Sequence, residues 1–146
     1  MWTTKITRKT SATKEQIWKL WADVPNWSTW DKDVEKAELF GDFAVGTKGM
    51  LRPVGGPKVK FEIIECEKFK SFTSRSSLPL CTVDFIHSMN EIRDGLEITY
   101  EVQMTGILTF LFSRVIGKKM ATELPTAVDK LIELAEIDTN GRWGVY

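Results

Sequence analysis

The residue with the clearest chemical potential in this chain is His87, its only histidine. An imidazole titrates near neutral pH, so in an apolar pocket it would suit proton transfer in enol or ketone chemistry. A histidine can equally be a core residue satisfied by Tyr100 or by a backbone carbonyl, or it can hydrogen-bond a ligand without reacting. The sequence leaves these three roles open for His87 and favours the satisfied core residue.

Three more polar side chains on predicted strands could act together with His87. Tyr100 has an apolar ring with one polar tip, which suits a core position and a ligand contact about equally. Arg52 and Arg75 could reach inward to anchor a carboxylate or a carbonyl, although an exposed position at the rim is favoured for each. In an enzyme, we would therefore expect His87 as acid or base, with Tyr100 or Arg75 polarising a carbonyl. In a binding protein, none of the three is catalytic.

Other kinds of reactive site have little support in the residue pattern. One histidine and two cysteines, Cys66 and Cys81, do not have the spacing of metal ligands, so we predict no metal site. The cysteines lack a nucleophile motif and fit small apolar core residues in a reducing compartment. Gly55-Gly56 is predicted to be a turn between strands, with no helix behind it to form a phosphate-binding loop. We therefore predict no cofactor.

Composition indicates one ordinary globular domain over residues 1–146, with 42% hydrophobic residues. Lys and Arg together number 20, as do Asp and Glu, so the overall charge gives no footprint for nucleic acid or for an anionic membrane surface. The longest apolar stretch, residues 107–116, falls short of the ~20 residues that a membrane span needs, and no signal peptide is visible. We therefore predict a cytoplasmic protein with no nucleic-acid partner and no membrane span.

The clearest strand pairing is an antiparallel hairpin over residues 81–104, with Asp94-Gly95 as its turn. Apolar and polar side chains alternate along the second strand, which is typical of a sheet with one buried face. A two-residue turn at 94–95 pairs Arg93 with Leu96, and hence His87 with Val102. Parity then places the following residues on one apolar, concave face: Cys81, Val83, Phe85, His87, Met89, Leu96, Ile98, Tyr100, Val102 and Met104.

The rest of the sheet is predicted as strands over residues 2–9, 34–40, 47–53, 58–68 and 70–78. The apolar parity changes at 63–64, which predicts a β-bulge that curls the sheet. After the first strand, Thr13 and Gln16 match a capping box that begins a helix, and Pro25 ends it. Four of the six tryptophans follow in this region, and they favour packing of a helix pair against the sheet over a cage for a flat ligand or a cation: Trp18, Trp21, Trp27 and Trp30.

A long amphipathic helix is predicted over residues 106–136. Its first three turns are apolar on nearly all sides, which indicates burial or the wall of a cavity. Pro125 lies inside the pattern and should kink the helix, and Gly117 should weaken it. Between this helix and the sheet we predict a cavity of roughly 300–1,000 Å³ for a ligand.

Residues 13–31, TKEQIWKLWADVPNWSTWD, and residues 40–47, FGDFAVGT, resemble the START-like (SRPBCC) superfamily. More narrowly, the chain is similar to the polyketide cyclase/dehydrase and lipid-transport group over essentially its whole length. The resemblance implies an α+β helix-grip fold, in which a seven-stranded curved antiparallel β-sheet wraps around a long C-terminal α-helix and two short helices follow the first strand. It also implies a cavity for an apolar ligand. The superfamily shares no catalytic signature, so the resemblance assigns no catalytic residue.

These observations favour a non-enzymatic protein that binds or carries a small hydrophobic ligand, lipid-like or polyketide-like. The residues predicted to contact the ligand are Phe85, His87, Met89, Tyr100, Phe112, Ile116 and Met120. Two alternatives stay open: a cyclase or dehydratase acting on a polyketide-like ketone, and a module that binds a protein partner through the surface of the same fold. We expect a monomer or a weak homodimer.

Overall fold

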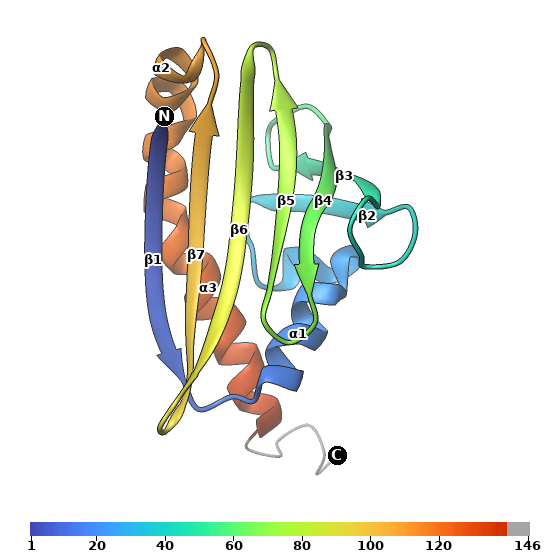
Figure 1. Cartoon of the computed structure of the whole chain (residues 1–146), viewed down its shortest axis with the longest axis vertical. Coiled ribbons are helices and arrows are strands. Elements are labelled where there is room, and N and C mark those ends of the chain that lie inside the picture. The colour runs from blue at the N-terminus through green and yellow to red at the C-terminus, as the bar shows by residue number, and fades with distance from the viewer. Residues whose placement is uncertain (140–146) are drawn as a thin grey trace.

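The chain folds into one curled sheet with helices on its concave side. The structure, a computed structural model, describes residues 1–139 and the side-chain surroundings of residues 1–137. Seven antiparallel strands lie in the order β1-β7-β6-β5-β4-β3-β2 (Figure 1). In chain order the elements are β1 (Trp2–Thr10), α1 (Lys14–Ala22), the 3₁₀ helix η1 (Val24–Thr29), β2 (Val34–Leu39), β3 (Lys48–Pro53), β4 (Val59–Glu67), β5 (Ser71–Leu78), β6 (Cys81–Ile92), β7 (Gly95–Thr105), α2 (Thr109–Phe112), the π-helical turn η2 (Ser113–Gly117) and α3 (Lys118–Thr139). The predicted helix-grip fold is confirmed.

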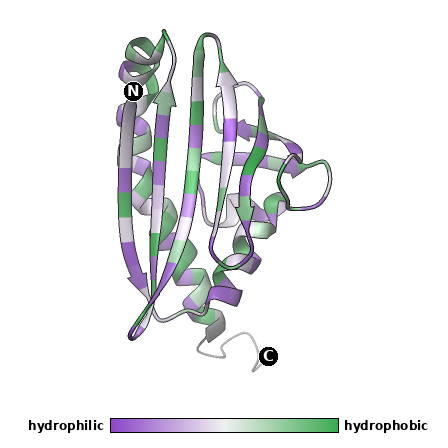
Figure 2. Cartoon of the chain, viewed as in Figure 1, coloured by the Kyte–Doolittle hydropathy of each residue, from purple (hydrophilic) through white to green (hydrophobic). Residues whose placement is uncertain are grey.

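The β6–β7 hairpin has the predicted parity but a different register. Ile92 pairs with Gly95, so the turn consists of Arg93-Asp94, and the prediction of a turn at Asp94-Gly95 is wrong. The pairing shifts by two residues, and His87 therefore lies opposite Tyr100, not Val102. Because side chains alternate with a period of two, this shift leaves every apolar side chain on its predicted face. Figure 2 shows the alternation of hydropathy along β7.

Local signals placed the other strands and the first helix well. The bounds of β1 to β5 each lie within one residue of the predicted ones. The Thr13 hydroxyl accepts the Gln16 backbone N–H, and the Gln16 side chain accepts the Thr13 N–H, so the capping box is confirmed. The register of β4 against β5 shifts between Ile63 and Glu65, which confirms the β-bulge.

The C-terminal helical segment is less regular at its start than predicted. α2 leads into the π-helical turn η2 before α3 begins, so regular α-helical geometry is interrupted at Ser113–Gly117. α3 continues across Pro125 as α-helix. Among the described residues, no helix has the length and apolar character to cross a bilayer.

α3 packs against β1, β7 and α1, and the tryptophans of α1 and η1 fill the other half of the concave face. Trp21 meets Phe72 of β5 edge-to-face, and Trp27 stacks on Phe61 of β4, with ring centroids 5.4 and 5.8 Å apart. The Trp27 indole N–H also donates to the Trp21 carbonyl oxygen at 2.9 Å. This arrangement explains the tryptophan cluster: large rings occupy volume that the single long helix does not reach.

Candidate ligand-binding site

The structure divides the seven predicted ligand contacts between two apolar clusters. His87, Met89 and Tyr100 are buried in the main core together with the tryptophans. Phe85, Phe112, Ile116 and Met120 are partly buried against a second cluster, which is built on Cys81, Val83, Val102 and Met104. Leu124 of α3 packs against both clusters and marks the boundary between them.

The two clusters meet at neighbouring rungs of the β6–β7 ladder. His87 pairs with Tyr100, and the next inward rung pairs Phe85 with Val102. A polar rung therefore lies directly beside an apolar rung on the concave face. An amphipathic ligand with one polar end matches this pattern, because its polar and apolar parts would each meet side chains of their own kind.

His87 is held between aromatic rings. Its imidazole stacks on Phe72 with centroids 4.1 Å apart and an interplanar angle of 4°, and it meets Tyr100 edge-to-face at 4.6 Å. Burial lowers the pKa of His87 to about 3, because the apolar surroundings disfavour the charged imidazolium. The side chain is thus a neutral imidazole at physiological pH, and its buried Nδ1 atom has no hydrogen-bond partner within residues 1–137.

Tyr100 is the centre of the polar rung. Its hydroxyl oxygen accepts a hydrogen bond from the Trp21 indole N–H at 3.0 Å, and burial raises its pKa well above the usual value. The Trp30 ring lies 6.1 Å from the Tyr100 ring, and the buried Trp30 indole N–H has no acceptor in the part of the chain that the structure describes. An unsatisfied buried donor costs about 1–3 kcal/mol, so this N–H is a ready point of attachment for an acceptor oxygen.

Asp31 brings an ionisable group to the edge of the same region. Burial raises the pKa of its carboxyl to about 6, and its charge in turn raises the pKa of Tyr100. The carboxylate accepts the Asp33 backbone N–H at 3.0 Å, and the adjacent Lys32 forms an ion pair with Glu123 of α3 at 3.0 Å. These contacts tie the turn after η1 to α3.

Trp30 and Asp31 were not among the predicted site residues. Their one sequence signal is their place at the end of the Trp-rich segment that carries the superfamily resemblance. Neither periodicity nor strand pairing could show that this turn reaches the hydroxyl end of Tyr100.

Arg75 lies away from this region. It pairs with Asp84 through two hydrogen bonds of 2.7 and 2.9 Å on the outward face of β5 and β6, with its side chain about half exposed. The alternative in which Arg75 polarises a ligand carbonyl inside the fold is therefore wrong. Arg52 on β3 is exposed as well.

The aromatic rings around His87 are closely packed. Trp21 and Phe72 are fully buried, and Tyr100 is almost so. The second cluster is more open: Phe85 and the row Phe112, Ile116, Met120 and Leu124 remain partly exposed although they are apolar. Successive residues of this row are four positions, or about one helical turn, apart.

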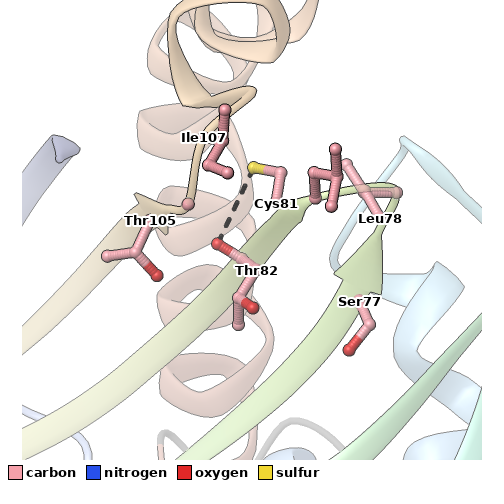
Figure 3. A pocket seen from close by; sticks show the side chains of 8 residues that line it. Ser77, Leu78, Cys81, Thr82, Thr105 and Ile107 are labelled. Atoms are coloured by element: carbon pink, nitrogen blue, oxygen red, sulfur yellow. Dashed lines mark hydrogen bonds between the residues drawn. The ribbon is translucent and has the colours of Figure 1, made fainter.

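Two surface pockets lie at other places in the fold. One, of about 420 Å³, lies at the end of the sheet between the β5–β6 turn and the β7–α2 connection, and it is lined by Leu78, Leu80, Cys81 and Ile107 (Figure 3). The other, also of about 420 Å³, lies between α1, η1 and the end of α3. Neither includes a predicted ligand contact, so a cavity between sheet and helix stays a prediction.

Comparison with known proteins supports the fold and assigns no specific function. No family model and no curated protein matches this chain. Among solved structures, the di-domain ARO/CYC StfQ from the steffimycin biosynthetic pathway superposes with a TM-score of 0.76 at 9% identity, covering 94% of this chain and 51% of that one. The Polyketide_cyc-like protein Cgl2372 from Corynebacterium glutamicum gives 0.63 at 19% identity, covering 94% and 93%. Ara h 8.0201 gives 0.66 at 12% identity, covering 90% and 98%.

The sequence identities to these three structures lie between 9% and 19%, so the likeness shows a shared fold and no more. The chain thus shares its helix-grip fold with these structures, which is the fold that the sequence resemblance implied. One of the similar structures is an ARO/CYC di-domain protein, and another is a Polyketide_cyc-like protein.

Proposed function

We propose that this protein binds a small hydrophobic molecule with one polar end, against the second cluster and the adjoining polar rung. The apolar part would lie between Phe85 on β6 and the row of Phe112, Ile116 and Met120. The polar end would point toward Tyr100 and Trp30. The likeness to the di-domain ARO/CYC StfQ and to the Polyketide_cyc-like protein Cgl2372 supports a polyketide-like ligand.

The observation that carries this proposal is the exposure of an apolar surface that faces the sheet. Apolar helix residues that face a sheet are normally buried in the core. Phe112, Ile116 and Met120 are only partly buried. Leaving such side chains in water costs about 25 cal/mol per Å² of apolar surface. A ligand that covers them recovers this free energy, whereas α3 farther along, at Val128 and Leu131, is already fully buried.

The polar rung favours an acceptor group on the ligand. The Trp30 indole N–H has no acceptor among the described residues, and the Trp30 ring meets the Tyr100 ring edge-to-face with centroids 6.1 Å apart. A carbonyl oxygen at this position would satisfy the N–H without placing a charge in the core. A ketone or ester therefore fits better than a cationic group.

Binding without reaction is better supported than cyclase chemistry. General acid–base catalysis works best when the pKa of the catalytic group is near the working pH. The pKa of His87 is lowered to about 3 by burial, so its imidazole is a weak base and carries no proton to donate at neutral pH. Arg75, the other predicted partner, points outward into its pair with Asp84.

The apolar half of the proposal is tested by titrating the protein with ethylnaphthalene. The quenching of tryptophan emission measures the binding. Ile116→Ser should lower the affinity severalfold, because a polar group would then face the naphthalene ring. Val115→Ser is the matched control, since Val115 is exposed and should leave the affinity unchanged. Absence of saturable binding by the unmodified protein, or equal losses in the two variants, would overturn the proposal.

The polar half is tested by comparing acetylnaphthalene with ethylnaphthalene, which differ in a carbonyl oxygen. Trp30→Phe removes the indole N–H and keeps an aromatic ring. It should lower the affinity for the ketone by about threefold to tenfold, which corresponds to the loss of one hydrogen bond, and leave the affinity for the hydrocarbon nearly unchanged. Equal effects on both probes would show that Trp30 acts only through packing.

A further inference from the structure

One end of the molecule exposes five large apolar side chains, which we call the apolar tip: Leu80, Ile107, Phe110, Leu111 and Val115. Ile107 is 76% exposed and Val115 is 68% exposed, so these side chains are largely in water. The Leu108 backbone N–H donates to the Leu80 carbonyl oxygen at 3.0 Å, which joins the β5–β6 turn to the start of α2. Figure 1 shows α2 and this turn at the same end of the sheet.

The backbone of the tip presents these residues at some cost. Leu80 has φ of 54°, a left-handed conformation in which glycine or asparagine fits more easily than a branched side chain. Its side chain is nevertheless exposed and lines the pocket at this end of the sheet. Leu80 is the second residue of the two-residue turn that joins Leu78 to Cys81, and a tight turn of this kind uses a positive φ.

The charges next to the tip are all positive. Arg114, Lys118 and Lys119 are exposed on η2 and the first turn of α3, directly after the apolar residues. The chain has no Asp or Glu between Glu101 and Glu123, and none between Glu67 and Asp84. None of the ion pairs between described residues uses these three cations. The zero net charge of the whole chain therefore hides a cluster of three cations on one side of an apolar end.

We propose that the apolar tip docks on the surface of a bilayer that contains anionic lipids. The five apolar side chains would enter the boundary between headgroups and acyl chains, and the three cations would lie among the lipid phosphates. A bilayer fits better than a protein groove, because the apolar residues project from one end of the fold and the flanking charge has a single sign. The ligand site of the second cluster begins on the same helical segment, so docking would bring its entrance close to lipid. The proposal goes beyond ligand binding and does not depend on it.

The test is sedimentation of the full chain with vesicles of phosphatidylcholine alone or mixed with phosphatidylserine, at low and moderate salt. We expect binding to the mixed vesicles, weaker binding as salt rises, and little binding to phosphatidylcholine alone. The charge variant Arg114→Gln, Lys118→Gln, Lys119→Gln should lose affinity by about fivefold per removed charge. The tip variant Ile107→Ser, Phe110→Ser should lose most of the binding and should keep the affinity for ethylnaphthalene.

Matched controls separate the tip from general effects. Lys48→Gln, Lys58→Gln, Lys60→Gln changes the net charge equally at exposed positions on the β3–β4 side of the sheet, and Phe40→Ser, Val45→Ser removes two exposed apolar residues elsewhere. Both should bind vesicles like the unmodified protein. Absent binding to mixed vesicles, or equal losses in the control variants, would overturn the proposal. Self-association that the tip variant abolishes, without vesicle binding, would also overturn it, because the tip would then contact a second copy of the chain.

Discussion

His87 and Tyr100 lie opposite each other on β6 and β7, with their rings 4.6 Å apart and inclined at 74°. The pair joins two aromatic groups: His87 stacks on Phe72, and Tyr100 accepts a hydrogen bond from Trp21. Two ionisable side chains thus lie side by side in the core, and both are neutral at physiological pH because burial penalises their charged forms. This neutrality has consequences that can be measured.

The first prediction concerns acid stability. The pKa of His87 is lowered from 6.5 to about 3 in the folded state, so between these values the unfolded chain binds a proton that the folded chain does not. The contribution of His87 to stability is therefore lost as the pH falls through this window, by about 1.4 kcal/mol for each pH unit. In His87→Phe this loss disappears, so the free energy of unfolding relative to the unmodified protein should rise on acidification. Urea unfolding at several pH values measures it, and a difference that stays constant with pH would contradict the assignment.

The second prediction concerns Asp31, which acts in the opposite direction. Its pKa is raised from 3.8 to about 6, chiefly by burial, so in this window the folded chain holds a proton that the unfolded chain has released. The contribution of Asp31 to stability is present below the lower value and is lost as the pH rises through the upper one. As the pH rises across this window, the free energy of unfolding of Asp31→Asn should increase by about 3 kcal/mol relative to that of the unmodified protein.

Both pH windows include the range from 3.8 to about 6. In this range the contributions of His87 and Asp31 to the free energy of unfolding change with pH in opposite directions, so they should nearly cancel in the unmodified protein. The same urea titration checks the second prediction. A pH-independent difference between Asp31→Asn and the unmodified protein would mean that the carboxyl is better solvated than the structure indicates.

The third prediction concerns Gly117 at the end of η2. The sequence suggested that alanine here would simply stiffen the helix. In the structure an added Cβ atom would lie 2.8 Å from the Trp2 ring, so the methyl group must push that ring aside. Gly117→Ala should therefore destabilise the protein by about 1–3 kcal/mol through overpacking.

A double-mutant cycle gives the control for Gly117. In a Trp2→Ala background the clash is absent, and alanine should stabilise the helical segment by up to about 1 kcal/mol over glycine. The sign of the substitution should thus reverse between the two backgrounds. The same sign in both would mean that the Trp2 contact does not limit this position.

The fourth prediction concerns the ligand entrance. The first half of the helical segment combines α2, the π-helical turn and a partly exposed apolar row, whereas Val128 and Leu131 are fully buried. Bound acetylnaphthalene should slow amide hydrogen exchange at residues 112–120 and change it little at residues 128–135. The opposite pattern would place the ligand at the other end of the fold.

Much of the fold could be predicted because its signals are local. The capping box of Thr13 and Gln16 needs only three intervening peptide units, and the bulge after Ile63 shows directly as a change of apolar parity. The turn of the last hairpin was misplaced although Asp-Gly is the stronger local turn signal. In the structure Gly95 belongs to β7 and lies against the Thr10 carbonyl oxygen, where an added Cβ atom would clash, so a contact distant in the chain uses this glycine. Parity survived since the error was an even number of residues.

The candidate site was only partly predictable for the same physical reason. Parity placed His87 and Tyr100 on the concave face, but it could not show that Phe72 and Trp21 would close around them. Those contacts join residues far apart in the chain, and their fit depends on ring volumes and on the path of α3. Trp30 and Asp31 were missed because the turn after η1 is positioned by tertiary packing.

The sequence by itself determined the strand order in the chain, the inward set of apolar residues and the long final helix, because each depends on periodicity within one segment. Only the tertiary structure decided how the apolar residues share the interior. It divided the predicted ligand contacts into a closed aromatic core and a more open second cluster. It also brought Leu80 of the β5–β6 turn to the exposed apolar start of the helical segment, because a contact between residues far apart in the chain depends on how the two segments fold together.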